Sequence, residues 1–142
     1  MLQLPTADVG TLIQVIQQAV APVFLLTGVG AILGVLVNRF GRVVDRFRKL
    51  EALNEVDKAP HLGEMKTLSR RAKWIHRAIT LCTVCALLVC IVIMALFVGV
   101  EMAVNPARLI ALLFVGAMGC LIAGLLCFLR EIALASGYLA LK

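Results

Sequence analysis

The sequence predicts an all-α integral membrane protein with three transmembrane helices, the first two of which extend into a cytoplasmic antiparallel helical hairpin. Of the 142 residues, 62% are hydrophobic and only 15% are charged, whereas an average soluble domain has about 45–50% apolar and about 25% charged residues. The mean hydropathy is +1.02, and the apolar residues lie in three blocks separated by polar stretches. This pattern favours spanning helices over one soluble core.

Each apolar block is long enough to cross a bilayer. Helices over residues 19–37, 78–100 and 109–129 would reach about 28, 34 and 31 Å, at a rise of about 1.5 Å per residue. The segment between the last two contains Asn105 and Pro106, which is a turn signal. We therefore expect a single membrane domain over residues 1–142. Its three spans are 19–37, 78–100 and 109–129. An outer amphipathic segment (1–18) precedes the first span, a cytoplasmic hairpin (38–77) and an outer turn (101–108) join the spans, and a cytoplasmic tail (130–142) follows the third.

The basic residues predict the orientation of these helices. Residues 38–77 hold eleven of the fourteen Lys and Arg residues, and the 38 residues that end at Asn38 hold none. Arg108 would be the single basic residue of the opposite side. The positive-inside rule therefore places 38–77 and the C-terminus in the cytoplasm and the N-terminus outside. We therefore expect a multi-pass protein of a plasma membrane.

Residues 38–77, which we call the arm, combine apolar and basic stripes. Residues 38–53 are predicted to continue the first helix, with Phe40, Val43, Val44, Phe47 and Leu50 on one face. After Pro60 and Gly63, a second helix carries apolar residues at spacings of three and four, namely Met65, Leu68, Ala72, Ile75 and Ile79. Two such stripes are expected to pack together, over too few heptads for an independent coiled coil.

Each arm helix also has a basic stripe at the same spacings, formed by Arg39, Arg42, Arg46 and Lys49 on the first and by Lys66, Arg70, Lys73 and Arg77 on the second. These stripes could contact anionic lipid headgroups or a protein partner. Alternatively, they are a solvated face that only sets the topology. Acidic residues interrupt the charge and aromatic residues are not interleaved with it, so we expect no nucleic-acid binding.

Several short motifs carry a family resemblance. Residues 21–28 read APVFLLTG and residues 38–48 read NRFGRVVDRFR; SRRA follows at 69–72, AITL at 78–81 and FLRE at 128–131. Together they resemble the bacterial family called domain of unknown function 2721 over nearly the whole chain. The resemblance implies a three-helix bacterial inner-membrane protein, and it brings no activity and no functional residues with it.

The residues offer little for catalysis or metal binding. All five cysteines, Cys82, Cys85, Cys90, Cys120 and Cys127, lie inside the second and third spans, where an apolar environment suppresses the thiolate form. We interpret them as small apolar packing residues. A nucleophile paired with a base, a phosphate-binding loop and a metal-ligand cluster are all missing from the sequence pattern. We therefore expect neither an enzyme nor a cofactor.

Small and polar residues in the spans suggest contacts between helices. Gly30 and Gly34 form a GxxxG motif on the first span, and Gly116, Cys120 and Gly124 repeat a small-xxx-small pattern on the third. Such contacts could lie within one chain or join copies in a homo-oligomer. Near the outer boundary, Gln14, Gln17 and Gln18, with Thr27 deeper, either begin an amphipathic helix or line a pore or vestibule.

Glu131 directly follows the third span and falls level with Arg39, Arg42 and Arg77 at the ends of the other two. A carboxylate at that depth could accept charge-assisted hydrogen bonds and clamp the base of the arm to the third helix. Alternatively, it is a solvated residue beside Arg130. Exposed ion pairs of that kind contribute under about 1 kcal/mol.

Two functional hypotheses follow from these features. The first is an oligomeric, non-enzymatic scaffold or assembly factor whose basic arm contacts anionic lipid or a partner. The second is an ion-conducting or gated channel formed by the first helices of an oligomer. A channel requires a continuous polar lane, and the spans supply few polar residues for one.

Overall fold

The computed structural model describes residues 6–140, with side chains described for 9–137. Three long helices, α1 (Thr6–Glu51), α3 (Leu62–Glu101) and α4 (Ala107–Ala140), account for most of this region. The short helix α2 (Glu55–Lys58) and a turn of 3-10 helix (Ala59–His61) join α1 to α3. The described part of the chain contains no strand, so the fold is all-α as predicted.

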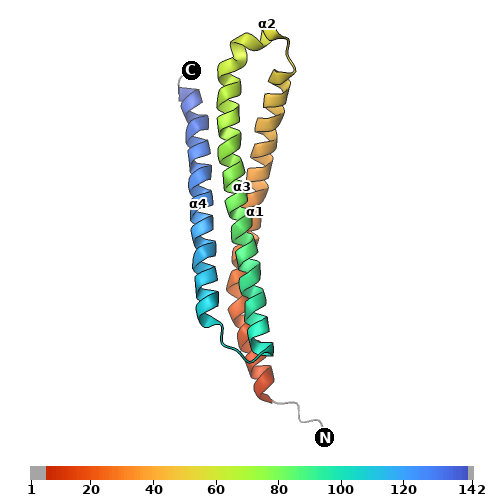
Figure 1. The fold of residues 1–142 in the computed structure, drawn as a ribbon, viewed down its shortest axis with the longest axis vertical. Coiled ribbons are helices and arrows are strands. Elements are labelled where there is room, and N and C mark those ends of the chain that lie inside the picture. The colour runs from red at the N-terminus through yellow and green to blue at the C-terminus, as the bar shows by residue number, and fades with distance from the viewer. Residues whose placement is uncertain (1–5, 141–142) are drawn as a thin grey trace.

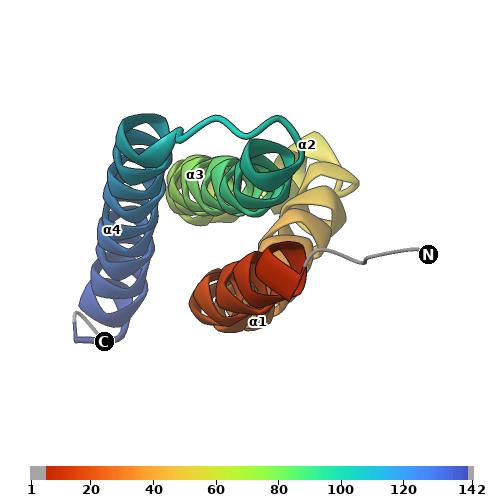
Figure 2. The same ribbon diagram turned by 90° about the horizontal axis from the view of Figure 1, so that it is seen from below.

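The central helix of the bundle is α3. Both α1 and α4 pack along it, while α1 and α4 hardly touch one another. Figure 1 shows α3 between the other two, and Figure 2 shows α1 and α4 diverging from its two sides. The first turns of α1 and the last turns of α4 lie at opposite ends of the bundle, as an odd number of crossings requires.

Buried positions recur with the spacing of coiled-coil seams. In α1 every seventh residue from Val15 to Leu50 is buried, a series completed by Pro22, Val29, Leu36 and Val43. In α3 the buried residues alternate at spacings of three and four, namely Ile75, Ala78, Cys82, Cys85, Val89 and Val92. A seven-residue spacing keeps one face of a helix turned towards its neighbour over many turns. The packed stripes therefore extend through both the apolar and the basic parts of the helices.

The helices differ in detail from their predicted bounds. The first helix ends at Glu51 rather than 53, and the breaker-rich connection forms α2 and the 3-10 turn. The predicted tail is helical to Ala140, because α4 continues through a stretch rich in Ala and Leu that lacks proline. At the other end of the bundle, the Asn105 side-chain oxygen accepts a hydrogen bond of 3.2 Å from the Ala107 N–H and so caps α4.

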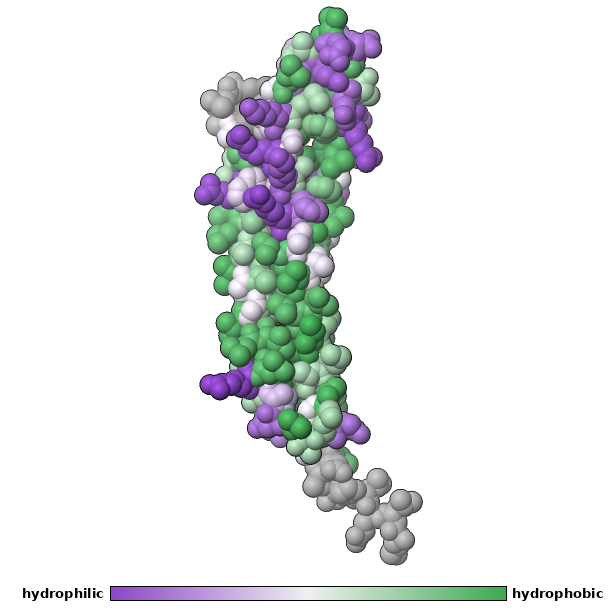
Figure 3. Space-filling view, in the orientation of Figure 1, coloured by the Kyte–Doolittle hydropathy of each residue, from purple (hydrophilic) through white to green (hydrophobic). Residues whose placement is uncertain are grey.

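All three long helices are long and apolar enough to cross a membrane. On the face shown in Figure 3, a broad hydrophobic band covers the middle of the bundle and hydrophilic residues gather at its ends, mainly at the end that carries α2. Large apolar side chains of the predicted spans, such as Phe24, Leu112, Val115 and Leu129, are exposed. Such exposure is expected where the surroundings are lipid. The chain therefore has the architecture of a multi-pass membrane protein.

The small residues predicted to pack helices fall into two groups. Gly124 lies against α3, where a Cβ atom would be 3.0 Å from the Cys82 Sγ, 3.3 Å from the Leu81 Cβ and 3.4 Å from the Ala78 carbonyl oxygen. Cys120 is half-buried, and Gly116 has only the Leu88 side chain within 4 Å of a Cβ position. Close approach of α3 and α4 thus depends on Gly124. By contrast, Gly30 and Gly34 face open space.

Replacing Gly124 should test this close approach. The change Gly124→Ala places a methyl group against Cys82 and should destabilise the protein by about 1–3 kcal/mol, as overpacking does. Gly119→Ala is the matched control on α4, because nothing lies within 4 Å of its Cβ position. Unfolding in detergent, followed by circular dichroism, measures both variants. Equal stability of the two variants would show that α4 does not pack on α3 at Gly124.

Candidate functional site

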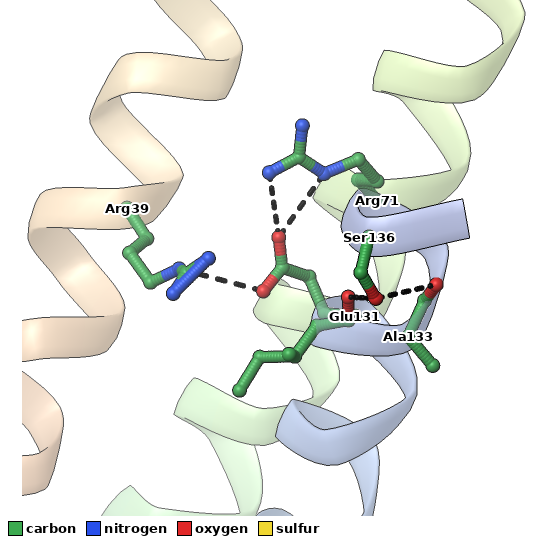
Figure 4. Close-up of polar contacts among 6 residues, drawn as sticks. Arg39, Arg71, Glu131, Ala133 and Ser136 are labelled. Carbon is green, nitrogen blue, oxygen red and sulfur yellow. Dashed lines mark hydrogen bonds and ion pairs between the residues drawn. The ribbon is translucent and has the colours of Figure 1, made fainter. Parts of the chain in front are cut away.

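The single buried charged side chain among the described residues is Glu131 on α4, and its side chain is 0% exposed. Arg71 of α3 donates to its Oε1 from both Nε, at 3.1 Å, and Nη2, at 2.8 Å. Arg39 of α1 places its Nε 3.4 Å from Oε2. Figure 4 shows the carboxylate between these two side chains. One acidic residue therefore interacts with a basic residue on each of the other two long helices.

The positions of Glu131 and Arg71 follow from the seams of their helices. Arg71 lies three residues after the buried Leu68 and four before the buried Ile75, in the stripe that otherwise holds apolar residues. Glu131 is seven residues beyond Gly124, which contacts α3. Residues seven apart share a face of a helix in such seams. Arg71 and Glu131 therefore both point into the interface between α3 and α4.

Arg39 is the main polar link between α1 and α4, which otherwise hardly touch. Besides its ion pair with Glu131, its guanidinium lies over the Phe128 ring, 5.4 Å from the ring centroid. An arginine over an aromatic face gains a cation–π attraction. This one side chain therefore contacts two residues of α4, one turn of helix apart.

A buried carboxylate is costly unless positive charge compensates it. Removing one partner of a fully buried ion pair costs about 3–5 kcal/mol, because the remaining charge is left without compensation. The Arg71 and Arg39 side chains are 23% and 36% exposed, so they stay partly hydrated. Oε2 of Glu131 has no hydrogen-bond partner among the described residues, although it is buried. The site therefore holds charge at a place that only these two guanidinium groups stabilise.

Of the three arginines that the sequence places level with Glu131, the structure brings one into contact with it. Arg39 lies beside Glu131, with its Nε 3.4 Å from Oε2, whereas the guanidinium of Arg77 lies 5.2 Å from the centroid of the Trp74 ring. Arg42 lies in a hollow between α1 and α3. Sequence reasoning missed Arg71. Its place between Leu68 and Ile75, as the one charge at a seam position, was the signal that could have found it.

The two basic stripes of the arm lie on opposite sides of the interface between α1 and α3. Arg39, Arg42 and Arg46 line a hollow of about 410 Å³ together with Arg71, Val43, Leu68 and Glu64. We call this the arginine hollow. Lys66, Arg70 and Lys73 line a different hollow of about 520 Å³, with Phe47, Leu62, Met65 and Ser69. Lys49 and Arg77 are exposed and line neither.

An ion pair lies at the edge of the arginine hollow. Arg46 donates from Nε to Oε1 of Glu64 at 2.9 Å, and His61 Nδ1 lies 3.5 Å from Oε2 of Glu64. The hydrogen bond from Arg46 lowers the pKa of Glu64 below its usual value, so this carboxylate is ionised at neutral pH. The pair joins the arm helices at a level well beyond the predicted span.

The polar residues near the start of α1 do not form a lane through the bundle. The Thr27 hydroxyl donates to the Val23 carbonyl oxygen of its own helix at 3.2 Å. Gln14 and Gln17 are exposed. Gln18 lines a hollow of about 850 Å³, which also includes Pro22 and Asn105, at the end of the bundle where α1 begins. No hydrogen bond or ion pair between these residues is seen in the described region.

The cysteines are all free, and they pack as small residues. Cys82 and Cys85 are buried in the seam of α3, while Cys90 is exposed and Cys120 and Cys127 are half-buried. Within residues 9–137, no three His, Cys, Asp or Glu side chains come close enough together to hold a metal ion. The one buried concentration of charge among the described residues is Glu131 with the two arginines beside it.

The family model described as "Protein of unknown function (DUF2721)" matches residues 19–141. This match covers α1 from residue 19 onward and all of α3 and α4, and it includes Arg39, Arg71 and Glu131. No curated protein and no solved structure matches the chain.

Removing the charge of Glu131 should weaken the packing of α4. Glu131→Gln leaves Arg71 and Arg39 without a counter-charge and should lower the free energy of unfolding by about 2 kcal/mol, less than for a fully buried pair because both arginines are partly exposed. Glu101→Gln is the control, because Glu101 is an exposed carboxylate at the end of α3. Thermal unfolding in detergent measures both. An equal or larger effect at Glu101 would contradict the role assigned to Glu131.

Proposed function

Because the chain belongs to the DUF2721 family, whose description assigns no activity, we propose a function from the geometry: a non-enzymatic, oligomeric scaffold of a bacterial inner membrane whose basic arm rests on anionic lipid. The proposal places the arm in the cytoplasm and the start of α1 outside. The concentration of Lys and Arg in residues 38–77 supports this orientation.

The observation that carries the proposal is the distribution of basic side chains around the arm. Arg39, Arg42 and Arg46 lie on one side of the interface between α1 and α3, and Lys66, Arg70 and Lys73 lie on the other. On the face shown in Figure 3, hydrophilic residues gather mainly beyond one edge of the hydrophobic band, at the end that carries α2. Each basic residue near an anionic membrane surface contributes about 1 kcal/mol of attraction. Basic residues on both sides of the arm are suited to hold it among headgroups.

The oligomeric part of the proposal is supported by the unused glycines of α1. Gly30 and Gly34 face open space, and the side of α1 turned away from α3 carries exposed apolar residues such as Val23 and Val35. Small residues four apart let two membrane helices approach closely. A second copy of the chain is the occupant that we propose for this face.

The alternative, a channel formed by the first helices, finds less support. Thr27, the deepest polar residue of α1 in the predicted span, donates its hydroxyl hydrogen to its own helix. Thr80 and Thr83 do the same in α3, to the carbonyl oxygens of His76 and Ile79. Hydroxyl groups bonded in this way need no polar partner on another helix. No observation in the described region favours the channel.

The lipid part of the proposal predicts a dependence of stability on headgroup charge. In nanodiscs of phosphatidylglycerol the protein should melt at a higher temperature than in nanodiscs of phosphatidylcholine, and salt should reduce the difference. Replacing Lys66, Arg70 and Lys73 with Gln should remove part of this stabilisation, about 1 kcal/mol for each charge. Arg108→Gln, at the other end of the bundle, is the control. Equal melting temperatures in the two lipids at low salt would refute the lipid contact.

A further inference from the structure

The arginine hollow has the composition of an anion site. Four guanidinium groups from two helices line it, those of Arg39, Arg42, Arg46 and Arg71. Two carboxylates oppose them, Glu64 in its wall and Glu131 beside it, so an excess of positive charge remains. We infer that the arginine hollow binds the phosphodiester of one anionic phospholipid. This inference rests on the proposed function and names the lipid contact at that site.

The hollow has more hydrogen-bond donors than the protein uses. A guanidinium carries five N–H groups, and Arg71 directs only Nε and Nη2 to Glu131. Arg39 is close to Oε2 of Glu131 without hydrogen-bonding to it. In the region that the structure describes, Arg42 has no hydrogen bond and no ion pair, and its side chain is exposed. Arginine is suited to planar, bidentate recognition of phosphate oxygens, so these N–H groups match a phosphodiester.

Glu131 positions two of the guanidinium groups before any ligand arrives. Its carboxylate is 0% exposed and contacts both Arg71 and Arg39, as Figure 4 shows. A side chain that is already ordered loses less entropy on binding. The buried carboxylate therefore acts as a positioning residue for an anion that itself would contact only the arginines.

An apolar surface adjoins the arginines, which distinguishes a lipid from a free anion. Phe128, whose ring lies under the Arg39 guanidinium, also lines an apolar hollow of about 340 Å³ on α4. The other lining residues of that hollow are Ile122, Leu125, Leu126, Leu129 and Ile132. The predicted spans end at 37 and 129, directly before Arg39 and Glu131. Acyl chains would lie along α4 while the phosphodiester reaches the arginines.

Native mass spectrometry of the full chain in detergent tests the site with defined lipids. We expect one molecule of phosphatidylglycerol to bind in preference to phosphatidylcholine, whose choline group would face four guanidinium groups. Arg42→Gln should weaken phosphatidylglycerol binding about fivefold, the factor that corresponds to about 1 kcal/mol for one basic residue. Arg48→Gln, on the same helix but outside the hollow, should leave it unchanged. Circular dichroism checks that both variants fold.

The other outcomes separate this inference from the broader proposal. If Arg48→Gln and Arg70→Gln weaken binding as much as Arg42→Gln, the attraction is diffuse, so the site is wrong while the arm still contacts anionic lipid. If the two lipids bind equally, both the site and the lipid part of the proposed function are wrong. If inorganic phosphate binds the chain as tightly as phosphatidylglycerol does, the acyl chains contribute nothing, so the hollow is a site for free phosphate and the lipid occupant is wrong.

Discussion

The ion pairs of Glu131 are the interaction on which the arrangement of the three helices depends. A carboxylate that is out of water must have positive charge beside it, and here Arg71 of α3 and Arg39 of α1 provide that charge. Both α1 and α4 are placed by their packing on α3, and Arg39 adds a direct polar contact between α1 and α4. Glu131 thus links α4 to both of the other long helices at one level of the bundle.

The contact between Glu131 and the two arginines matters in a membrane protein because the hydrophobic effect does not drive membrane helices together. Lipid solvates apolar side chains as well as another helix does, so membrane helices associate through close contact and polar interactions. Gly124 provides the close contact between α3 and α4, against Cys82. Glu131, seven residues farther on, provides the polar interaction on the same face. Leu36, Val43 and Ile75 complete the buried core around the junction of span and arm.

Much of the fold could be predicted from the sequence, because long apolar blocks can satisfy their backbone hydrogen bonds in lipid only as helices or closed barrels. The glutamate at the end of the third span was identifiable because it falls level with arginines at the ends of the other two spans, Arg39 among them. Its partner Arg71 was missed because the apolar stripe was drawn through Ala72, the next residue. Whether Arg71 or Ala72 faces α4 depends on how α3 is rotated about its own axis. That rotation is set by tertiary contacts such as Gly124 against Cys82.

The separation of the two basic stripes was likewise beyond the sequence pattern. Spacings of three and four place Arg39, Arg42 and Arg46 on one face of α1 and Lys66, Arg70 and Lys73 on one face of α3. These spacings do not determine on which side of the interface between α1 and α3 each basic face lies. In the structure Val43, Leu50 and Leu68 occupy that interface, which puts one basic set on each side. Which arginines share a hollow is therefore a property of the packed helices.

A double-mutant cycle between Arg71 and Glu131 measures the central interaction most directly. The free energy of unfolding in detergent would be determined for the original chain, for Arg71→Gln, for Glu131→Gln and for the two changes combined. If the ion pair holds α4 against α3, the double variant loses less stability than the sum of the single variants, with a coupling energy above about 1 kcal/mol. Additive losses would contradict the account, because they would mean that the two side chains stabilise the protein independently.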